Sequence, residues 1–128
     1  MSRAGSQPAQ ATVEVALAAL LFGLVVAVAL QVGFWAYADN ITLAAAQEAA
    51  RAASAQGSDL AHGLEVGNSL LQGGLGPSAH LVTLTGREDA TSVTIDVSGG
   101  WPLGLGTTSP LSLPLDNEVR MLKQMWTP

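Results

Sequence analysis

One uncharged stretch of 24 residues, at positions 15–38, constrains this chain more than any other feature. It reads VALAALLFGLVVAVALQVGFWAYA and contains no proline. A helix of that length covers roughly 36 Å, which exceeds the roughly 30 Å of hydrocarbon in a bilayer. Phe34, Trp35 and Tyr37 lie at its C-terminal end, and aromatic rings favour the membrane interface. The stretch therefore predicts a membrane-spanning helix over residues 15–38.

Composition supports this interpretation and excludes several classes of protein. Only 12% of the 128 residues are charged, whereas a typical soluble domain has roughly 25%. Five basic residues against ten acidic ones leave a net charge of −5, which argues against binding to nucleic acid. The chain has no cysteine, which excludes disulfides, thiolate zinc sites and cysteine nucleophiles.

Charges on either side of the apolar stretch indicate its orientation. Arg3 precedes the stretch, whereas Asp39 and Glu48 follow it, so the positive-inside rule places the N-terminus in the cytoplasm and the rest of the chain outside. A removable signal peptide is an alternative, because Ala36-Tyr37-Ala38 offers a small-x-small site for cleavage after Ala38. The apolar stretch is, however, longer than the usual 7–15 residues of a signal-peptide core.

Glu14 stands at the edge of the apolar stretch, where burying an unpaired carboxylate is costly. One interpretation is an acid in the first turn of a helix, favoured by the helix dipole. Its surroundings, AQATVEVAL at residues 9–17, suggest another, because this run resembles the processing site of type IV pilin-like proteins and, in detail, the TadE-like minor pilins or pseudopilins of tight-adherence systems.

The resemblance implies a leader at residues 1–9, cleaved by a prepilin-type peptidase between Ala9 and Gln10. Family members usually have glycine before the cut, and this chain has Ala9. Glu14 would be fifth in the mature chain and would act in assembly. The implied partners are membrane lipid, other pilin-like subunits, the peptidase and an assembly platform, and the implied location is the cytoplasmic membrane and then a surface pilus.

The apolar stretch is predicted to continue into one long helix over residues 10–56. No proline occurs between residues 15 and 56, and residues 39–56 are rich in alanine, with Gln47, Glu48 and Arg51 at helical spacing. Small side chains also recur every three or four residues within the span, a pattern that lets helices approach closely in lipid. This predicted packing face comprises Ala16, Ala19, Gly23 and Ala27.

Residues 57–128 are predicted to form a small exported head, which gives an α+β fold overall. A second helix would begin at a Ser58-Asp59 cap and end at Gly73-Gly74. Strands are predicted at 79–85 and 91–98, with a turn at 86–89 and a glycine-rich loop at 99–110. Residues 111–115 alternate as an edge strand containing Pro114, and 119–126 suit either helix or strand; the resemblance favours a third strand.

No motif in the chain predicts catalysis. His62 and His80 belong to different predicted elements, and the zinc, phosphate-binding and serine-nucleophile motifs are missing from the sequence. We therefore expect no enzyme activity, cofactor, metal or small-molecule substrate. The sequence favours a minor pilin or pseudopilin; the alternatives are an uncleaved single-pass accessory protein of an export or adhesion complex, and a secreted binding module released after Ala38.

Overall fold

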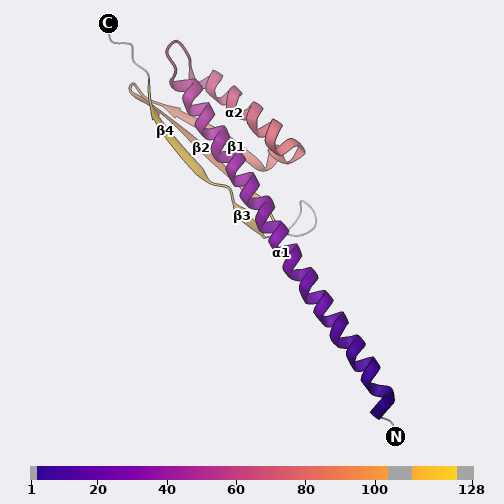
Figure 1. Ribbon diagram of the computed structural model, residues 1–128. Coiled ribbons are helices and arrows are strands. Elements are labelled where there is room, and N and C mark those ends of the chain that lie inside the picture. The colour runs from indigo at the N-terminus through magenta and orange to yellow at the C-terminus, as the bar shows by residue number, and fades with distance from the viewer. Residues whose placement is uncertain (1–2, 104–110, 124–128) are drawn as a thin grey trace. The chain divides into compact units, whose positions relative to one another are not determined.

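The structure is a computed structural model that describes residues 3–103 and 111–123, with side chains from residue 8 onward. In chain order its elements are α1 (Arg3–Ser54), α2 (Leu60–Leu75), the 3-10 helix η1 (Gly76–Leu81), β1 (Val82–Glu88), β2 (Ser92–Pro102), β3 (Ser112–Pro114) and β4 (Asn117–Leu122) (Figure 1). Two compact units result, Met1–Phe34 and Trp35–Pro128, and α1 contributes to both. The α+β class predicted from the sequence is confirmed.

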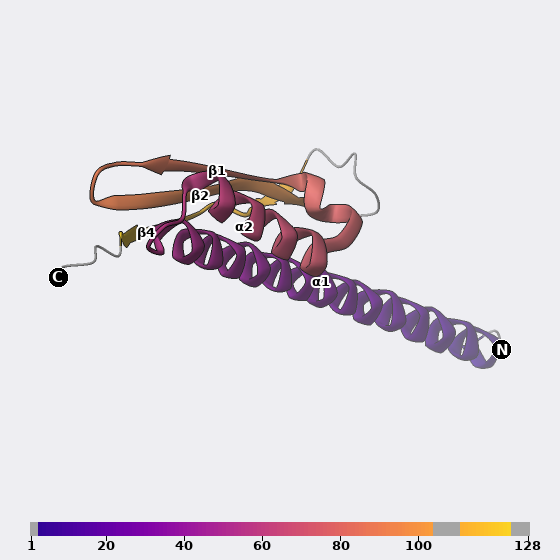
Figure 2. The same cartoon turned by 90° about the horizontal axis from the view of Figure 1, so that it is seen from above.

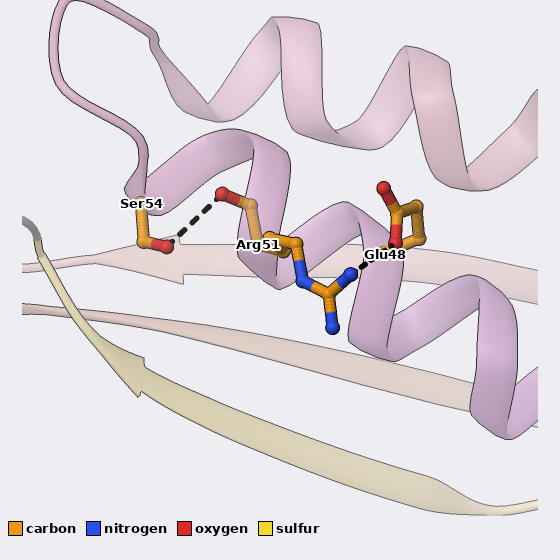
Figure 3. A network of polar contacts seen from close by, with 3 residues as sticks. All are labelled: Glu48, Arg51 and Ser54. Atoms are coloured by element: carbon orange, nitrogen blue, oxygen red, sulfur yellow. Dashed lines mark hydrogen bonds and ion pairs between the residues drawn. The ribbon is translucent and has the colours of Figure 1, made fainter.

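Helix α1 differs from the predicted 10–56 at both ends. It begins at Arg3, so it includes most of the predicted leader, and it contains Pro8. It ends at Ser54 rather than at residue 56. Gly57, which follows shortly after this end, adopts a positive φ of 79°. Near this end the predicted helical spacing produces contacts: Arg51 Nη1 lies 3.3 Å from Glu48 Oε2, and Ser54 Oγ donates to the Arg51 carbonyl at 3.1 Å (Figure 3).

The sheet of the second unit is antiparallel and is organised around β2. Strand β1 pairs with β2 from Val82↔Gly99 to Glu88↔Val93. On the other side of β2, β4 pairs with residues 92–97 and β3 with residues 100–102. Leu115, between β3 and β4, is fully buried and donates its backbone N–H to the Gly99 carbonyl at 3.0 Å. Strands β3 and β4 thus form one interrupted third strand, and the strand expected after residue 111 is confirmed over the described residues.

One face of this sheet is covered by α2 and by the part of α1 in the same unit (Figure 2). The alternation predicted for β2 is confirmed, because Val93, Ile95 and Val97 are at most 3% exposed. The part of α1 in this unit contributes small side chains to the same core: Ala38, Ala45, Ala46, Ala49, Ala50 and Ala53. Small residues keep the helix close to the elements that it packs against.

Glycines let α2 approach α1 closely. A Cβ at Gly63 would lie 2.5 Å from the Ala49 carbonyl oxygen, and a Cβ at Gly67 would lie 2.8 Å from Ala49 Cβ and 2.5 Å from Leu84 Cδ2. A methyl group at either position would force the two helices apart. Gly63 and Gly67 are both buried on the same helix.

The predicted start of α2 is confirmed and its predicted end is wrong. Asp59 caps the helix, with Oδ1 accepting a 2.9 Å hydrogen bond from the His62 backbone N–H. The helix then continues past Gly73-Gly74 to Leu75, and Gly76, at φ 57°, follows as the C-cap. Gly74 instead permits close packing, because a Cβ there would lie 2.6 Å from Ile41 Cγ2.

The predicted strand boundaries also need correction. Residues 79–81 belong to η1, and β1 runs through Gly86, which was expected in the turn. Gly86 lies within the strand, and Leu60 packs over it. A Cβ at Gly86 would lie 2.6 Å from Leu60 Cδ1. The turn comes after β1, where Asp89 donates its N–H to the Ser92 carbonyl at 2.9 Å.

The glycine-rich loop expected at 99–110 begins later than predicted. Gly99 and Gly100 continue β2, which ends at Pro102. Gly99 is in close contact with the backbone of η1 and β1. The lack of a side chain at Gly99 lets these elements lie close to β2, and it does not mark the start of a loop. The rest of that loop, residues 104–110, and the last predicted residues, 124–126, lie outside the described residues.

Candidate membrane span, processing junction and assembly surface

The apolar part of α1 in the first unit is exposed along its length. Its large side chains are each at least 40% exposed: Val13, Val15, Leu17, Leu20, Leu21, Phe22, Leu24, Val25, Val26, Val28, Leu30, Val32 and Phe34. Soluble monomers rarely expose contiguous apolar patches beyond a few hundred Å². By length and composition α1 is able to cross a membrane, and its most apolar window contains no buried residue. This helix fits a single-pass membrane protein.

The predicted packing face lies on the same exposed helix. Ala16, Ala19, Gly23 and Ala27 are all exposed, and apart from the neighbouring residues and nearby backbone of α1 itself, no described atom lies within 4 Å of where a Cβ on Gly23 would be. A close partner helix would therefore meet no steric obstacle at this glycine. The packing role of these four residues stays a prediction.

The predicted processing junction lies within α1. Ala9 and Gln10 are exposed, and their peptide bond falls in the turn in which Thr12 Oγ1 donates to the Pro8 carbonyl at 2.8 Å. Pro8 has no backbone N–H, so this part of the helix lacks the bond that would reach the Ala4 carbonyl. The missing bond lowers the cost of opening the helix beside the Ala9–Gln10 junction.

Glu14 is exposed on α1, four residues after Gln10. Residues at this spacing lie on the same side of a helix. Among the described residues the ion pairs are all in the second unit, Glu48–Arg51, Arg87–Asp96 and Glu88–Lys123, and Glu14 has no partner of this kind. Its carboxylate is therefore available to a group from another chain, although its role in assembly stays a prediction.

A polar contact that the sequence analysis missed ties α1 to the sheet. Asn117 Nδ2, at the start of β4, donates to Asp39 Oδ1 and to Thr42 Oγ1, both at 3.1 Å. Thr42 is fully buried, and its hydroxyl donates in turn to the Asp39 carbonyl at 2.8 Å. No local pattern predicts this contact, because its partners are more than 70 positions apart.

The aromatic residues expected at the membrane interface make a second connection to the head. Trp35 Nε1–H donates to the Pro114 carbonyl at 2.9 Å, and the Tyr37 hydroxyl donates to the Gly74 carbonyl at 2.8 Å. The acceptors are the last residue of β3 and a residue in the final turn of α2. The beginning of the second unit is therefore part of the head, not a free stalk.

The titratable residues of the head make separate local contacts. Asp59 binds the backbone N–H of His62, while the His80 ring lies 2.6 Å from the Pro77 carbonyl in η1. Glu88 pairs with Lys123 at 2.7 Å. In the part of the chain that the structure describes, no three His, Asp or Glu side chains come together as metal ligands would.

One comparison with known proteins gives a result. Residues 9–51 match the family model of TadE-like proteins, a match that covers about a third of the chain. The matched segment includes the Ala9–Gln10 junction, Glu14 and the apolar span, and it supports the resemblance to pilin-like proteins of tight-adherence systems. No curated protein and no solved structure matches the chain.

Proposed function

We propose that this chain, which resembles TadE-like proteins over residues 9–51, is a minor pilin or pseudopilin. In this role it is a structural subunit of a tight-adherence type pilus or secretion filament and not an enzyme. The observation that carries the proposal is the exposed apolar half of α1, preceded within the matched segment by Glu14, which forms no ion pair with any described residue. A surface of this kind needs a lipid or protein partner along its whole length.

The span serves two environments in this proposal. Before assembly it crosses the cytoplasmic membrane, with the N-terminus in the cytoplasm and the head outside. After assembly it packs in the core of a helical bundle, where the exposed Ala16, Ala19, Gly23 and Ala27 allow close helix contacts. The partners are then lipid, other pilin-like subunits and an assembly platform.

Processing creates the group that Glu14 would bind. Cleavage between Ala9 and Gln10 by a prepilin-type peptidase would leave a new amine on Gln10. In a low-dielectric bundle an unpaired carboxylate is expensive, so the arrangement that pairs Glu14 with a neighbouring subunit's amine is favoured over other axial registers. Glu14 thereby selects one register among several that apolar packing alone would allow.

The two alternatives differ in their mature N-termini, and intact-mass measurement separates them. The pilin proposal requires Gln10, the uncleaved accessory protein requires Met1 or Ser2, and the secreted module requires Asp39. The packing counts against the secreted module. Cleavage after Ala38 would remove that fully buried residue and the hydrogen bonds that Trp35 and Tyr37 make with the head.

Replacing Glu14 with Gln tests the assembly role directly. This substitution keeps the side-chain size and removes the charge, so membrane insertion should be preserved while incorporation into sheared surface filaments falls sharply. Glu65→Gln is the matched control, because Glu65 is an exposed acid on α2 in the head. Cells carrying each variant are fractionated, and membrane-bound and sheared protein are measured separately. Wild-type amounts of the Glu14→Gln variant in the sheared fraction would remove Glu14 from assembly.

A further inference from the structure

The end of the head at which α1 enters it is built largely from uncharged segments of the chain. Two long segments of the head, residues 66–86 and 97–115, contain no Asp, Glu, Lys or Arg. Their described parts meet the start of the second unit, because Tyr37 bonds to Gly74 and Trp35 bonds to Pro114. We call the side chains at this end the proximal surface: Trp35, Tyr37, Trp101, Leu103, Leu111 and Leu113.

Backbone contacts hold the proximal surface together. Trp101 is paired with Leu113 across β2 and β3, and Leu103 donates its N–H to the Leu111 carbonyl at 2.9 Å. Tyr37 and Leu111 are 53% and 66% exposed, and the other four side chains are partly exposed. The result is an apolar and aromatic surface on ordered backbone.

The opposite end of the head has a different composition. There β1 ends at Glu88, which pairs with Lys123 at 2.7 Å, and Arg51 pairs with Glu48 in the last turns of α1. Arg87 pairs with Asp96 across β1 and β2. The described ion pairs of the head therefore lie toward this opposite end, whereas Asp39 and Asp116, nearer the proximal surface, accept hydrogen bonds from Asn117 and from the Gly99 N–H.

Two backbone carbonyls at the proximal end accept hydrogen bonds from aromatic side chains of α1. Trp35 and Tyr37 use their own donors to bind the Pro114 and Gly74 carbonyls, so neither these rings nor these acceptors need water. Pro77, Pro102 and Pro114 carry no N–H at all. Unsatisfied backbone groups are what makes irregular structure costly in lipid. Each carbonyl that is bonded in this way lowers the cost of placing this end of the head at the boundary of a bilayer.

We propose that the proximal surface is a lipid-docking surface, which lies in the headgroup layer of the membrane that the span crosses. The inference rests on the membrane-inserted state in the proposed function. Trp and Tyr rings favour this layer, and the chain enters the hydrocarbon within a few residues of Trp35. The occupant is the lipid boundary, because Trp35 and Tyr37 follow the exposed apolar part of α1 directly in sequence and because all six side chains of the surface are uncharged.

Single-cysteine labelling tests the proposal, since the natural chain has no cysteine to remove. Full-length protein with Ser112→Cys, Leu122→Cys or Gly23→Cys is spin-labelled and reconstituted at low density into phosphatidylcholine vesicles. Ser112 and Leu122 are both exposed, on β3 and β4, at opposite ends of the head. Accessibility to oxygen, which concentrates in lipid, is compared with accessibility to a water-soluble nickel chelate.

We expect the Gly23→Cys label to report hydrocarbon, the Ser112→Cys label the headgroup boundary, and the Leu122→Cys label bulk water. Equal aqueous accessibility at positions 112 and 122, with a lipid signal at position 23, would overturn docking and leave the span in place. An aqueous signal at position 23 would overturn both the membrane-inserted state and docking. A label at position 112 that is shielded from both reagents, increasingly so at higher protein density, would assign the surface to a second copy and overturn lipid docking.

Two matched leucines give an independent measurement. Leu111 and Leu122 are 66% and 74% exposed and lie at opposite ends of the head. In the Ser112→Cys background, Leu111→Glu should shift the label from the headgroup boundary to water, because it places a charge in the lipid-facing surface. Leu122→Glu should leave the label unchanged. An identical response to the two substitutions would contradict lipid docking. The proposed pilin function is tested separately, by the incorporation of Glu14→Gln into filaments.

Discussion

The side-chain amide of Asn117 donates to the carboxylate of Asp39 across 78 positions of sequence, at 3.1 Å. The same amide reaches Thr42, whose side chain is fully buried against the sheet. One residue of β4 thus binds two polar side chains that lie about one turn apart on α1, shortly after the aromatic residues that bond to the head. These hydrogen bonds fix the position of α1 against the sheet, whereas the surrounding alanines contribute only close packing.

Asn117→Ala should therefore destabilise the head. It removes the donor to the Asp39 carboxylate and to the Thr42 hydroxyl, which keeps its bond to the Asp39 carbonyl, and each lost hydrogen bond costs about 0.5–1.5 kcal/mol. Chemical unfolding of the full-length protein in detergent, followed by tryptophan fluorescence, measures the change. Asn40→Ala is the control, because Asn40 is exposed on α1 and its truncation should change stability by less than about 0.5 kcal/mol. Equal unfolding midpoints for the two variants would contradict a structural role for Asn117.

Two glycines of α2 should respond to the same substitution with opposite signs. Gly67→Ala places a methyl group 2.5 Å from Leu84 Cδ2 and 2.8 Å from Ala49 Cβ, so it should destabilise by about 1–3 kcal/mol. Gly73→Ala meets no described atom within 4 Å beyond the neighbouring residues and nearby backbone of α2 itself, and it should stabilise the helix by about 0.5–1 kcal/mol. The unfolding free energies of both variants are compared with that of the natural chain. Stabilisation by Gly67→Ala would show that the two helices do not approach as closely as described.

Neighbouring positions on β2 should differ in their tolerance of charge. Ile95 is fully buried, so Ile95→Asp buries an unpaired carboxylate at a cost of several kcal/mol and should unfold the sheet. Thr94 is on the opposite face, paired across strands with Arg87 and Arg120, so Thr94→Asp should be tolerated. Limited proteolysis of the two variants makes the comparison. Equal sensitivity to the protease would reject the assignment of two unlike faces.

Processing should depend on the size of residue 9. A small side chain before the cut leaves room in the peptidase active site, so Ala9→Phe should block maturation, and Ala9→Gly should not reduce it. Intact mass of the chain, isolated from cells that contain the cognate peptidase, shows whether the N-terminus is Gln10. If Ala9→Phe matures as fully as the natural chain, cleavage does not occur at this junction.

The features predicted correctly from the sequence depend on residues close to one another in the chain. The uncharged stretch of residues 15–38, the Asp59 cap and the alternation of Val93, Ile95 and Val97 are each complete within a short window. Hydrophobic periodicity and capping act through neighbours a few positions apart, so they are readable without a structure. The family match over residues 9–51 includes the uncharged stretch.

Only the tertiary structure decided the roles of the glycines and the polar contacts. Gly74 was expected to end α2 and Gly86 to form a turn, yet both allow close approach, to Ile41 and to Leu60. The amide of Asn117 was unremarked until β4 brought it beside Asp39. A glycine permits either a sharp turn or a tight contact, and the sequence pattern is the same for both. The choice depends on which side chain lies opposite, and that side chain comes from a distant part of the chain.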